Sequence, residues 1–171
     1  IELQTQSPIM YTISLTSIPS RFSELAPVLK SLRDQSQRPQ AVELWISRRY
    51  RRFPDWEFAV PEVPEGVTVR ITDYDYGPAT KILPAALDRR DSQWPIIYCD
   101  DDGVAPSQFS ASLLKWHKIK PDHAIANRGY DLASMGMPYR DGLKQPRAKR
   151  LPSRFDLSVI ARRIQRGAIQ K

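Results

Sequence analysis

Hydrophobic and polar residues follow short repeating patterns along the first 126 residues of this chain. Residues 11–16 alternate with a period of two, which is typical of a strand with one covered face. Alternating or continuous apolar runs predict further strands at 42–46, 67–71, 96–99 and 123–126. Apolar residues at helical spacing predict helices at 21–34, at 79–88 and after Pro106. Strands that alternate with helices predict an α/β fold, with a Rossmann-like, mostly parallel sheet flanked by helices.

Proline, glycine and capping residues refine these boundaries. Ser20 is the expected N-cap of the helix at 21–34, and Pro78 can begin the helix at 79–88. Pro84 should shorten or kink that second helix, because its ring cannot occupy a helix interior without strain. Residues 54–66 hold three prolines and one glycine and are predicted to be a loop.

The pattern weakens after Asn127. Residues 129–154 are rich in glycine, proline and charge, which predicts a long mobile loop, and residues 156–169 can form a basic helix. At 171 residues the chain has the length of one domain. We therefore predict a single domain over 1–171, in which 129–171 is a basic, loop-rich segment that need not be complete.

Composition narrows the class of protein. A hydrophobic content of 41% and a charged content of 26% are ordinary for a soluble globular protein, and no apolar run is long enough to span a bilayer. The single cysteine, Cys99, excludes an internal disulfide, and the N-terminus has no secretory signal pattern. We expect a cytoplasmic protein, at most peripheral to the inner face of the membrane.

Charge is distributed unevenly along the chain. Residues 1–103 carry 12 Lys and Arg against 15 Asp and Glu, a net charge of −3, whereas residues 104–171 carry 14 against 4, a net charge of +10. Such an asymmetry predicts that the second part meets phosphates, an anionic membrane or nucleic acid. A basic nucleic-acid-binding domain without catalysis is therefore one alternative, although no helix-turn-helix, RNA-binding sheet or zinc-finger signature supports nucleic acid as a partner.

Three aspartates, Asp100, Asp101 and Asp102, directly follow the apolar run at 96–99. Adjacent carboxylates repel one another, and a position at the end of a buried strand adds a desolvation cost. Mn²⁺ or Mg²⁺ relieves both penalties, because such hard cations prefer oxygen ligands that they share with substrate phosphates. Since side chains alternate along an extended backbone, Asp100 and Asp102 can reach a metal while Asp101 reaches a ribose hydroxyl. We expect Asp100 to be the most buried of the three. The simpler alternative to a metal site is that the triplet forms an acidic turn that caps the next helix.

The triplet also fits a second class of enzyme. Together with Gly103 and Val104 it matches the nucleophile loop of the haloacid-dehalogenase-like phosphatases. That fold normally opens with this strand and needs a later pair of aspartates. Here 99 residues precede the triplet and the later aspartates are isolated, so we rank this alternative lower.

Three segments in the same order and spacing resemble a bacterial glycosyltransferase family with the GT-A fold: residues 13–22, 75–83 and 96–102. The resemblance covers residues 11–104. It implies transfer of a sugar from a nucleoside diphosphate sugar, most simply a UDP-sugar, to an acceptor hydroxyl in surface polysaccharide or glycan synthesis. It also implies a glycan or lipid-linked acceptor, and it makes Asp100 and Asp102 the metal ligands of a "DxD" motif.

The resemblance further implies that the loop from Thr16 to Arg21 holds the nucleotide. The residues of this loop that we assign to the nucleotide sugar are Thr16, Ser17, Pro19 and Arg21. The loop leads into the start of a helix, where the backbone favours anions. Arg21 can add charge to a diphosphate or stack on a base.

Four further residues complete the predicted nucleotide-sugar site: Asp73, Asp75, Lys81 and Asp101. Asp73 ends the third predicted strand and resembles the residue that contacts the nucleobase or ribose in such folds. Lys81 lies in the first turn of a helix, where a cation is unfavourable without an anionic partner, which we expect to be a phosphate, Asp73 or Asp75. No catalytic base stands out, so the stereochemistry of transfer stays open.

Overall fold

The computed structural model describes residues 9–127 of the chain. Four parallel strands form one sheet in the order β3-β2-β1-β4. Their bounds are β1 Thr12–Thr16, β2 Ala41–Ser47, β3 Val67–Thr72 and β4 Ile96–Cys99. The predicted α/β fold with a parallel sheet is confirmed, and so is the loop predicted at 54–66, which contains no helix or strand.

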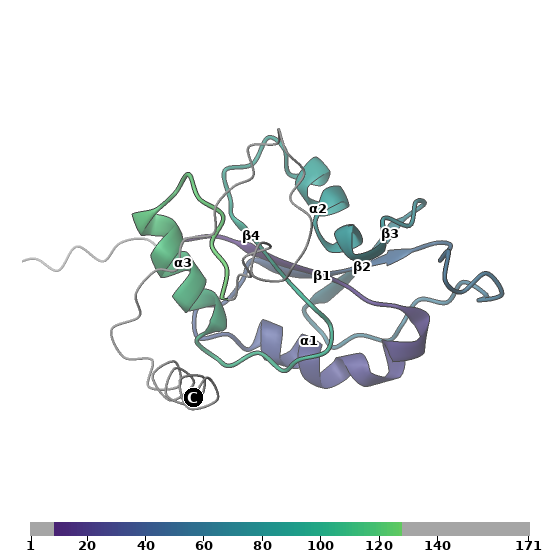
Figure 1. The fold of residues 1–171 in the computed structure, drawn as a ribbon. Coiled ribbons are helices and arrows are strands. Elements are labelled where there is room, and N and C mark those ends of the chain that lie inside the picture. The colour runs from purple at the N-terminus through teal and green to yellow at the C-terminus, as the bar shows by residue number, and fades with distance from the viewer. Residues whose placement is uncertain (1–8, 128–171) are drawn as a thin grey trace, which may run out of the picture. The chain divides into compact units, whose positions relative to one another are not determined.

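Helices lie on both sides of this sheet, as Figure 1 shows for α1 below it and α2 above it. The 3₁₀ helix η1 (Pro19–Glu24) continues directly into α1 (Leu25–Arg33), and η2 (Gly77–Lys81) precedes α2 (Leu83–Asp88). The last described helix is α3 (Phe109–Ile119). Pro84 lies in the first turn of α2, which explains why the helix predicted at 79–88 is divided in two.

One side of the sheet, which we name the α1 face, is apolar. Its strand side chains lie in register and are buried: Ile13, Leu15, Val42, Leu44, Ile46 and Ile97. They pack in one cluster with four buried side chains of α1 and with Leu114 of α3. Burial of each such side chain is worth about 1.5–3 kcal/mol, so this layer contains the core of the described region.

The other side of the sheet, which we name the α2 face, is polar. Ser14 and Glu43 are register partners on β1 and β2, and both are buried. Trp45 follows on the same face, and Ala85 of α2 is fully buried. Ser14 Oγ donates to Lys81 O at the end of η2, and Glu43 pairs with Arg89 just after α2, so polar contacts hold both segments to the sheet.

Three details of the secondary structure differ from prediction. Ser20 is not an N-cap, because η1 already begins at Pro19, after Ile18, and has no capping side chain. Residues 123–126 do not form a strand: the chain turns after α3, where His123 N donates to Lys120 O at 3.1 Å. The continuous apolar run at 96–99 predicts a buried strand, yet among the described strands β4 lies at the edge, and Tyr98 is 52% exposed.

The described helices and strands fall in one compact unit. None of these helices is both long and apolar enough to cross a membrane. The segment 129–171, with its predicted loop and basic helix, lies outside the described residues.

Candidate functional site

All four parallel strands end at the same edge of the sheet, which we name the carboxyl edge. It consists of the strand ends and the segments that follow them, at 16–21, 47–53, 72–77 and 99–103. In open parallel sheets this is the edge where ligands bind. Lys81, which ends η2, reaches the same place, so every predicted site residue lies at or beside this edge.

Asp101 is the most enclosed residue of the triplet. Its carboxylate accepts a hydrogen bond from Ser17 Oγ and an ion-pair hydrogen bond from Arg21 Nη1 at 2.7 Å. Only 10% of the Asp101 side chain is exposed, against 44% of the Arg21 side chain. These contacts join the loop after β1 to the loop after β4, and they bring together three residues that the sequence assigns to the nucleotide sugar.

Asp100 points to the opposite side and pairs with Lys81 Nζ. The Asp100 side chain is 73% exposed, so the prediction that it is the most buried of the three is wrong. The reason is that β4 ends at Cys99, so alternation sends Asp100 to the α2 face and returns Asp101 toward η1. Lys81 is 15% exposed, and its partner is neither Asp73 nor Asp75.

Asp102 is exposed and forms no hydrogen bond or ion pair with any other described residue. No group of three or more metal-binding side chains gathers anywhere in residues 9–127. Asp100 and Asp102 are nevertheless two solvent-facing carboxylates, two residues apart in one loop. Mg²⁺ is usually held by one or two carboxylates together with substrate phosphates and water, and not by a cage of protein ligands. The donor set therefore fits a cation that arrives with a phosphate ligand.

Asp75 stabilises the loops around the site. One carboxylate oxygen accepts from Arg51 N at 2.9 Å, and the other accepts from Gly77 N at 2.8 Å. The side chain is 10% exposed, and Gly77 has a φ of +58°, which a residue with a side chain adopts only with strain. Asp75 thus ties the loop after β2 to the loop after β3.

Asp73, Thr16 and Pro19 complete the predicted set. Asp73 is 88% exposed and pairs with Arg48 at 2.8 Å. Thr16 Oγ1 donates to Trp45 O at 2.7 Å, which ties the ends of β1 and β2 together. Pro19 lies in the first turn of η1 and directs the loop that carries Ser17 and Arg21.

Tyr50 supports the site and was missed in the sequence. Its hydroxyl donates to Ser17 O at 2.8 Å and accepts from Ser47 N at 3.3 Å. Burial raises the pKa of Tyr50 to about 12, and the negative charges of Asp75 and Asp101 act in the same direction. Tyr50 lies within the basic stretch at 48–52, where charge is the more prominent pattern in the sequence.

Cys99 is the last residue of β4 and directly precedes the triplet. Burial raises the pKa of its thiol to about 12; Asp100 and Asp101 add to this shift, and Lys81 opposes it. The thiol therefore stays protonated at neutral pH, and a protonated thiol is neither a good nucleophile nor a good metal ligand.

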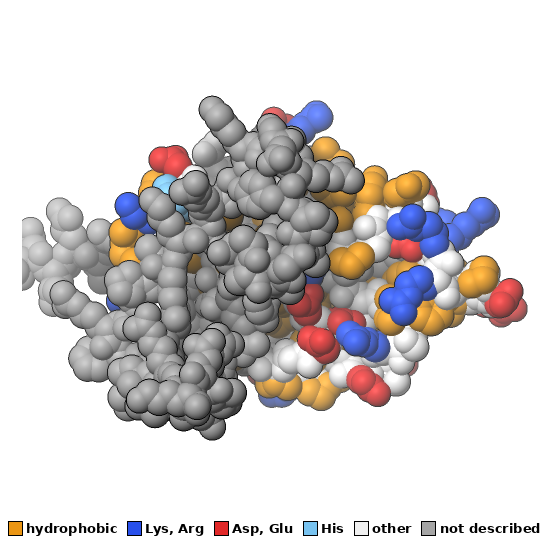
Figure 2. Space-filling model, in the orientation of Figure 1, with side chains coloured by type: hydrophobic (Ala, Val, Ile, Leu, Met, Phe, Trp, Pro, Cys, Tyr) orange, Lys and Arg blue, Asp and Glu red, His pale blue; other side chains and the backbone are white. Residues whose placement is uncertain are grey.

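The edge presents charges of both signs. In the view of Figure 2, acidic, basic and hydrophobic side chains lie close to one another on the described part of the surface. Arg48 illustrates the arrangement, since it pairs with Asp73 and lies 5.3 Å from the ring centre of Phe58. Carboxylates for a cation and cations for a phosphate are thus available at one edge.

Compared with known proteins, the sequence matches no protein-family model, and no curated protein or solved structure is significantly similar to it. The function must therefore be argued from the chemistry of the carboxyl edge.

Proposed function

We propose that this chain binds a nucleoside diphosphate sugar at the carboxyl edge and takes part in transferring the sugar to an acceptor hydroxyl, as a metal-dependent glycosyltransferase. One observation carries the proposal: the aspartate triplet lies between Lys81 on one side and Arg21 on the other. A diphosphate with its cation needs both kinds of charge within reach of one another.

Asp100 and Asp102 are the residues that would hold Mn²⁺ or Mg²⁺. Both are exposed, and both carry oxygen ligands suited to a hard cation. When bound, such a cation acts as a Lewis acid on the leaving diphosphate. Asp102 needs no rearrangement, whereas Asp100 must share or release Lys81.

The chain's own residues have separate roles in this proposal. Lys81 and Arg21 offer positive charge to the diphosphate. Asp101 shapes the nucleotide loop, because it is held by Ser17 and Arg21, and its remaining lone pairs can accept from a ribose hydroxyl. Tyr50 keeps Ser17 in place beneath them.

Titration calorimetry with uridine diphosphate, with and without Mn²⁺, tests the proposal. We expect binding by the wild-type chain that depends on Mn²⁺, and we expect Asp102→Asn to abolish it while the melting temperature stays near the wild-type value. The matched control is Asp122→Asn, which removes a charge from another exposed aspartate and should leave binding unchanged. If no nucleoside diphosphate binds with either Mn²⁺ or Mg²⁺, the proposal is wrong.

Asp101→Asn gives a different expected result, because this side chain is enclosed and paired. The variant keeps its shape but weakens the hydrogen bonds to Ser17 and Arg21, each charge-assisted contact being worth about 1.5–3 kcal/mol. We expect a lower melting temperature and weaker donor binding, but not a complete loss. Normal donor binding by Asp102→Asn together with none by Asp101→Asn would reverse the roles assigned within the triplet.

The two alternatives lead to other outcomes with the same protein. A basic nucleic-acid-binding domain would shift an oligonucleotide in a gel at low salt, with an affinity that falls steeply as salt rises. A phosphatase of the haloacid-dehalogenase-like class would release phosphate from a general phosphomonoester substrate, and Asp100→Asn would stop it. We expect neither result.

A further inference from the structure

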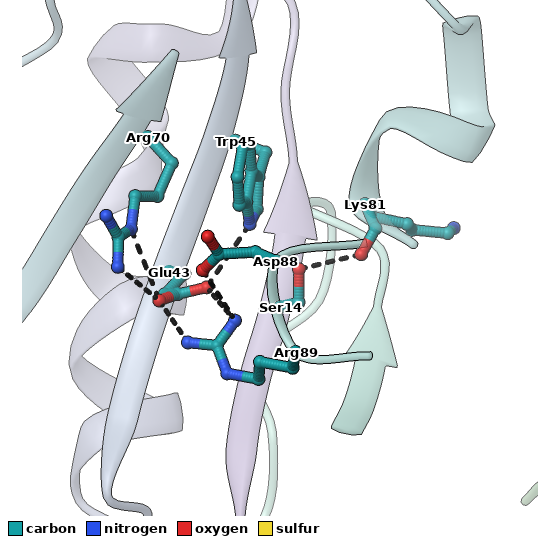
Figure 3. A network of polar contacts seen from close by, with 7 residues as sticks. All are labelled: Ser14, Glu43, Trp45, Arg70, Lys81, Asp88 and Arg89. Carbon is teal, nitrogen blue, oxygen red and sulfur yellow. Dashed lines mark hydrogen bonds and ion pairs between the residues drawn. The ribbon is translucent and has the colours of Figure 1, made fainter. Parts of the chain in front are cut away.

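A buried ion cluster holds η2 and α2 on the α2 face, and Figure 3 shows its members. The Glu43 carboxylate is only 2% exposed. It pairs with both terminal nitrogens of Arg89, one of them at 2.9 Å, and it accepts from Arg70 Nε and Nη2 at 3.3 Å. Trp45 Nε1 adds a fifth donor at 3.3 Å.

Such a cluster is an expensive way to attach a helix to a sheet. Removing charges from water costs several kcal/mol per ion, and apolar residues of similar volume often give equal or greater stability. Unlike apolar packing, however, a bidentate arginine fixes both distance and orientation. The Glu43–Arg89 pair therefore fixes the position of α2 on the sheet more than it adds to the free energy of unfolding.

The segment from Lys81 to Arg89 is attached to the sheet at both ends. Arg89 is the C-cap residue of α2 and pairs with Glu43 of β2. At the other end, Ser14 Oγ donates to Lys81 O at 2.7 Å. Since Ser14 and Glu43 are register partners on neighbouring strands, both anchors lie side by side on the α2 face. Between them, Ala85 is fully buried.

The side chain of Lys81 leaves this attached segment and reaches across to Asp100, just after β4. A lysine side chain is long and flexible, so its end remains in one place only if its backbone is held. We propose that Glu43 and Arg89 are positioning residues that hold Lys81 Nζ at the aspartate triplet. This placement is a property of the protein alone; its consequence for a diphosphate rests on the proposed function.

Trace acetylation of the full chain, followed by peptide mass spectrometry, measures the placement without any ligand. In the wild type we expect Lys81, at 15% exposure, to react more slowly than Lys30, at 65%. Glu43→Gln should raise the rate at Lys81 severalfold and leave the rate at Lys30 unchanged. Asp100→Asn removes the partner of Lys81 directly and sets the expected upper value.

Arg89→Lys provides a second variant in case Glu43→Gln does not fold. It keeps the charge and loses the bidentate geometry, and it should also raise labelling at Lys81. The matched control is Arg90→Lys, which makes the same exchange one residue further along, in an exposed ion pair with Asp91, and should leave the rates at Lys81 and Lys30 unchanged. If labelling of Lys81 stays at the wild-type rate in a folded variant, or if Lys30 and Lys81 rise together, the positioning role is wrong.

A double-mutant cycle then connects the placement to binding. Glu43→Gln should weaken binding of uridine diphosphate with Mn²⁺ severalfold in the wild-type background, and it should have no further effect in a Lys81→Met background. A general loosening of the fold would weaken binding in both backgrounds and would contradict the role. If the wild type binds no nucleoside diphosphate, the proposed function fails, while the labelling rates still decide the positioning role.

Discussion

The two faces of the sheet are covered in opposite ways. On the α1 face, aliphatic side chains of three strands pack with four buried residues of α1. On the α2 face, a buried glutamate, two arginines and a serine hold a much shorter helix. Apolar burial is strong but non-directional, whereas hydrogen-bonded ions are directional and contribute little net stability.

This difference corresponds to what each layer carries toward the carboxyl edge. The layer on the α1 face leads to Ser17 and Tyr50, whose contacts shape the loop around Asp101. The layer on the α2 face leads to Lys81 and Asp100, where the charged Nζ of Lys81 must lie at a defined point beside the aspartate triplet. We infer that the first face supplies stability and the second supplies placement, and the two can be changed separately.

The largest expected effect on stability comes from the α1 face. Leu29 is fully buried in α1, and Leu29→Ala should lower the free energy of unfolding by about 2–5 kcal/mol, because it leaves a cavity. Urea unfolding of the full chain measures this. Leu87→Ala makes the same change at a residue of α2 that is 65% exposed, and it should cost less than about 0.5 kcal/mol. Equal losses in the two variants would contradict the assignment of the core to the α1 face.

A smaller effect on stability is expected when the ion pair of the α2 face is replaced as a unit. Glu43→Leu combined with Arg89→Met should leave the free energy of unfolding within about 1 kcal/mol of the wild type, since apolar substitutes commonly match buried ion pairs and the remaining partner, Arg70, is 44% exposed and can be solvated. Acetylation of Lys81 should nevertheless rise as it does in Glu43→Gln. A double variant that loses as much stability as Leu29→Ala would show that the cluster contributes stability after all.

Most of the fold could be predicted because apolar periodicity reports directly on the α1 face. The strands at β1 to β4 and the helices on either side follow from residues such as Val42, Leu44 and Ile46, which alternate in the sequence as they do in the sheet. The carboxyl edge follows in turn, because strands that run parallel end together. The prediction at 123–126 failed because a short apolar run forms a strand only when a neighbouring strand pairs with it.

The α2 face could not be predicted in the same way. Alternation places Glu43 and Val42 on opposite faces of the sheet. It does not reveal that Glu43 is buried, nor that its partner Arg89 lies 46 residues further along the chain. The order of burial within the triplet also depends on a single residue, because ending β4 at Cys99 decides which aspartate turns toward Ser17. Pairings between distant charged residues leave no local pattern in one sequence.

A similarly small effect is expected where the core of the α1 face meets the carboxyl edge, at Tyr50. Its pKa is raised from an ordinary value of 10.0 to about 12, so the folded state keeps the phenol neutral while the unfolded state ionises. The stability due to this group is therefore complete below pH 10 and is lost as the pH rises from 10 to 12. At pH 11 the loss should be about 1 kcal/mol, because the unfolded phenol is then largely ionised and the folded one is not.

Tyr50→Phe should cost about 1 kcal/mol at neutral pH, since Ser17 O and Ser47 N lose their partner. The free energy of unfolding of this variant should nevertheless fall less between pH 10 and pH 11 than that of the wild type. Urea unfolding of both proteins at pH 8, 10 and 11 measures the difference, and the comparison cancels the contributions of Tyr11 and Cys99, whose raised pKa values the two proteins share. Parallel loss of stability in the two proteins would mean that Tyr50 ionises as easily in the folded state as in the unfolded one, and that its hydroxyl is not enclosed beneath Ser17.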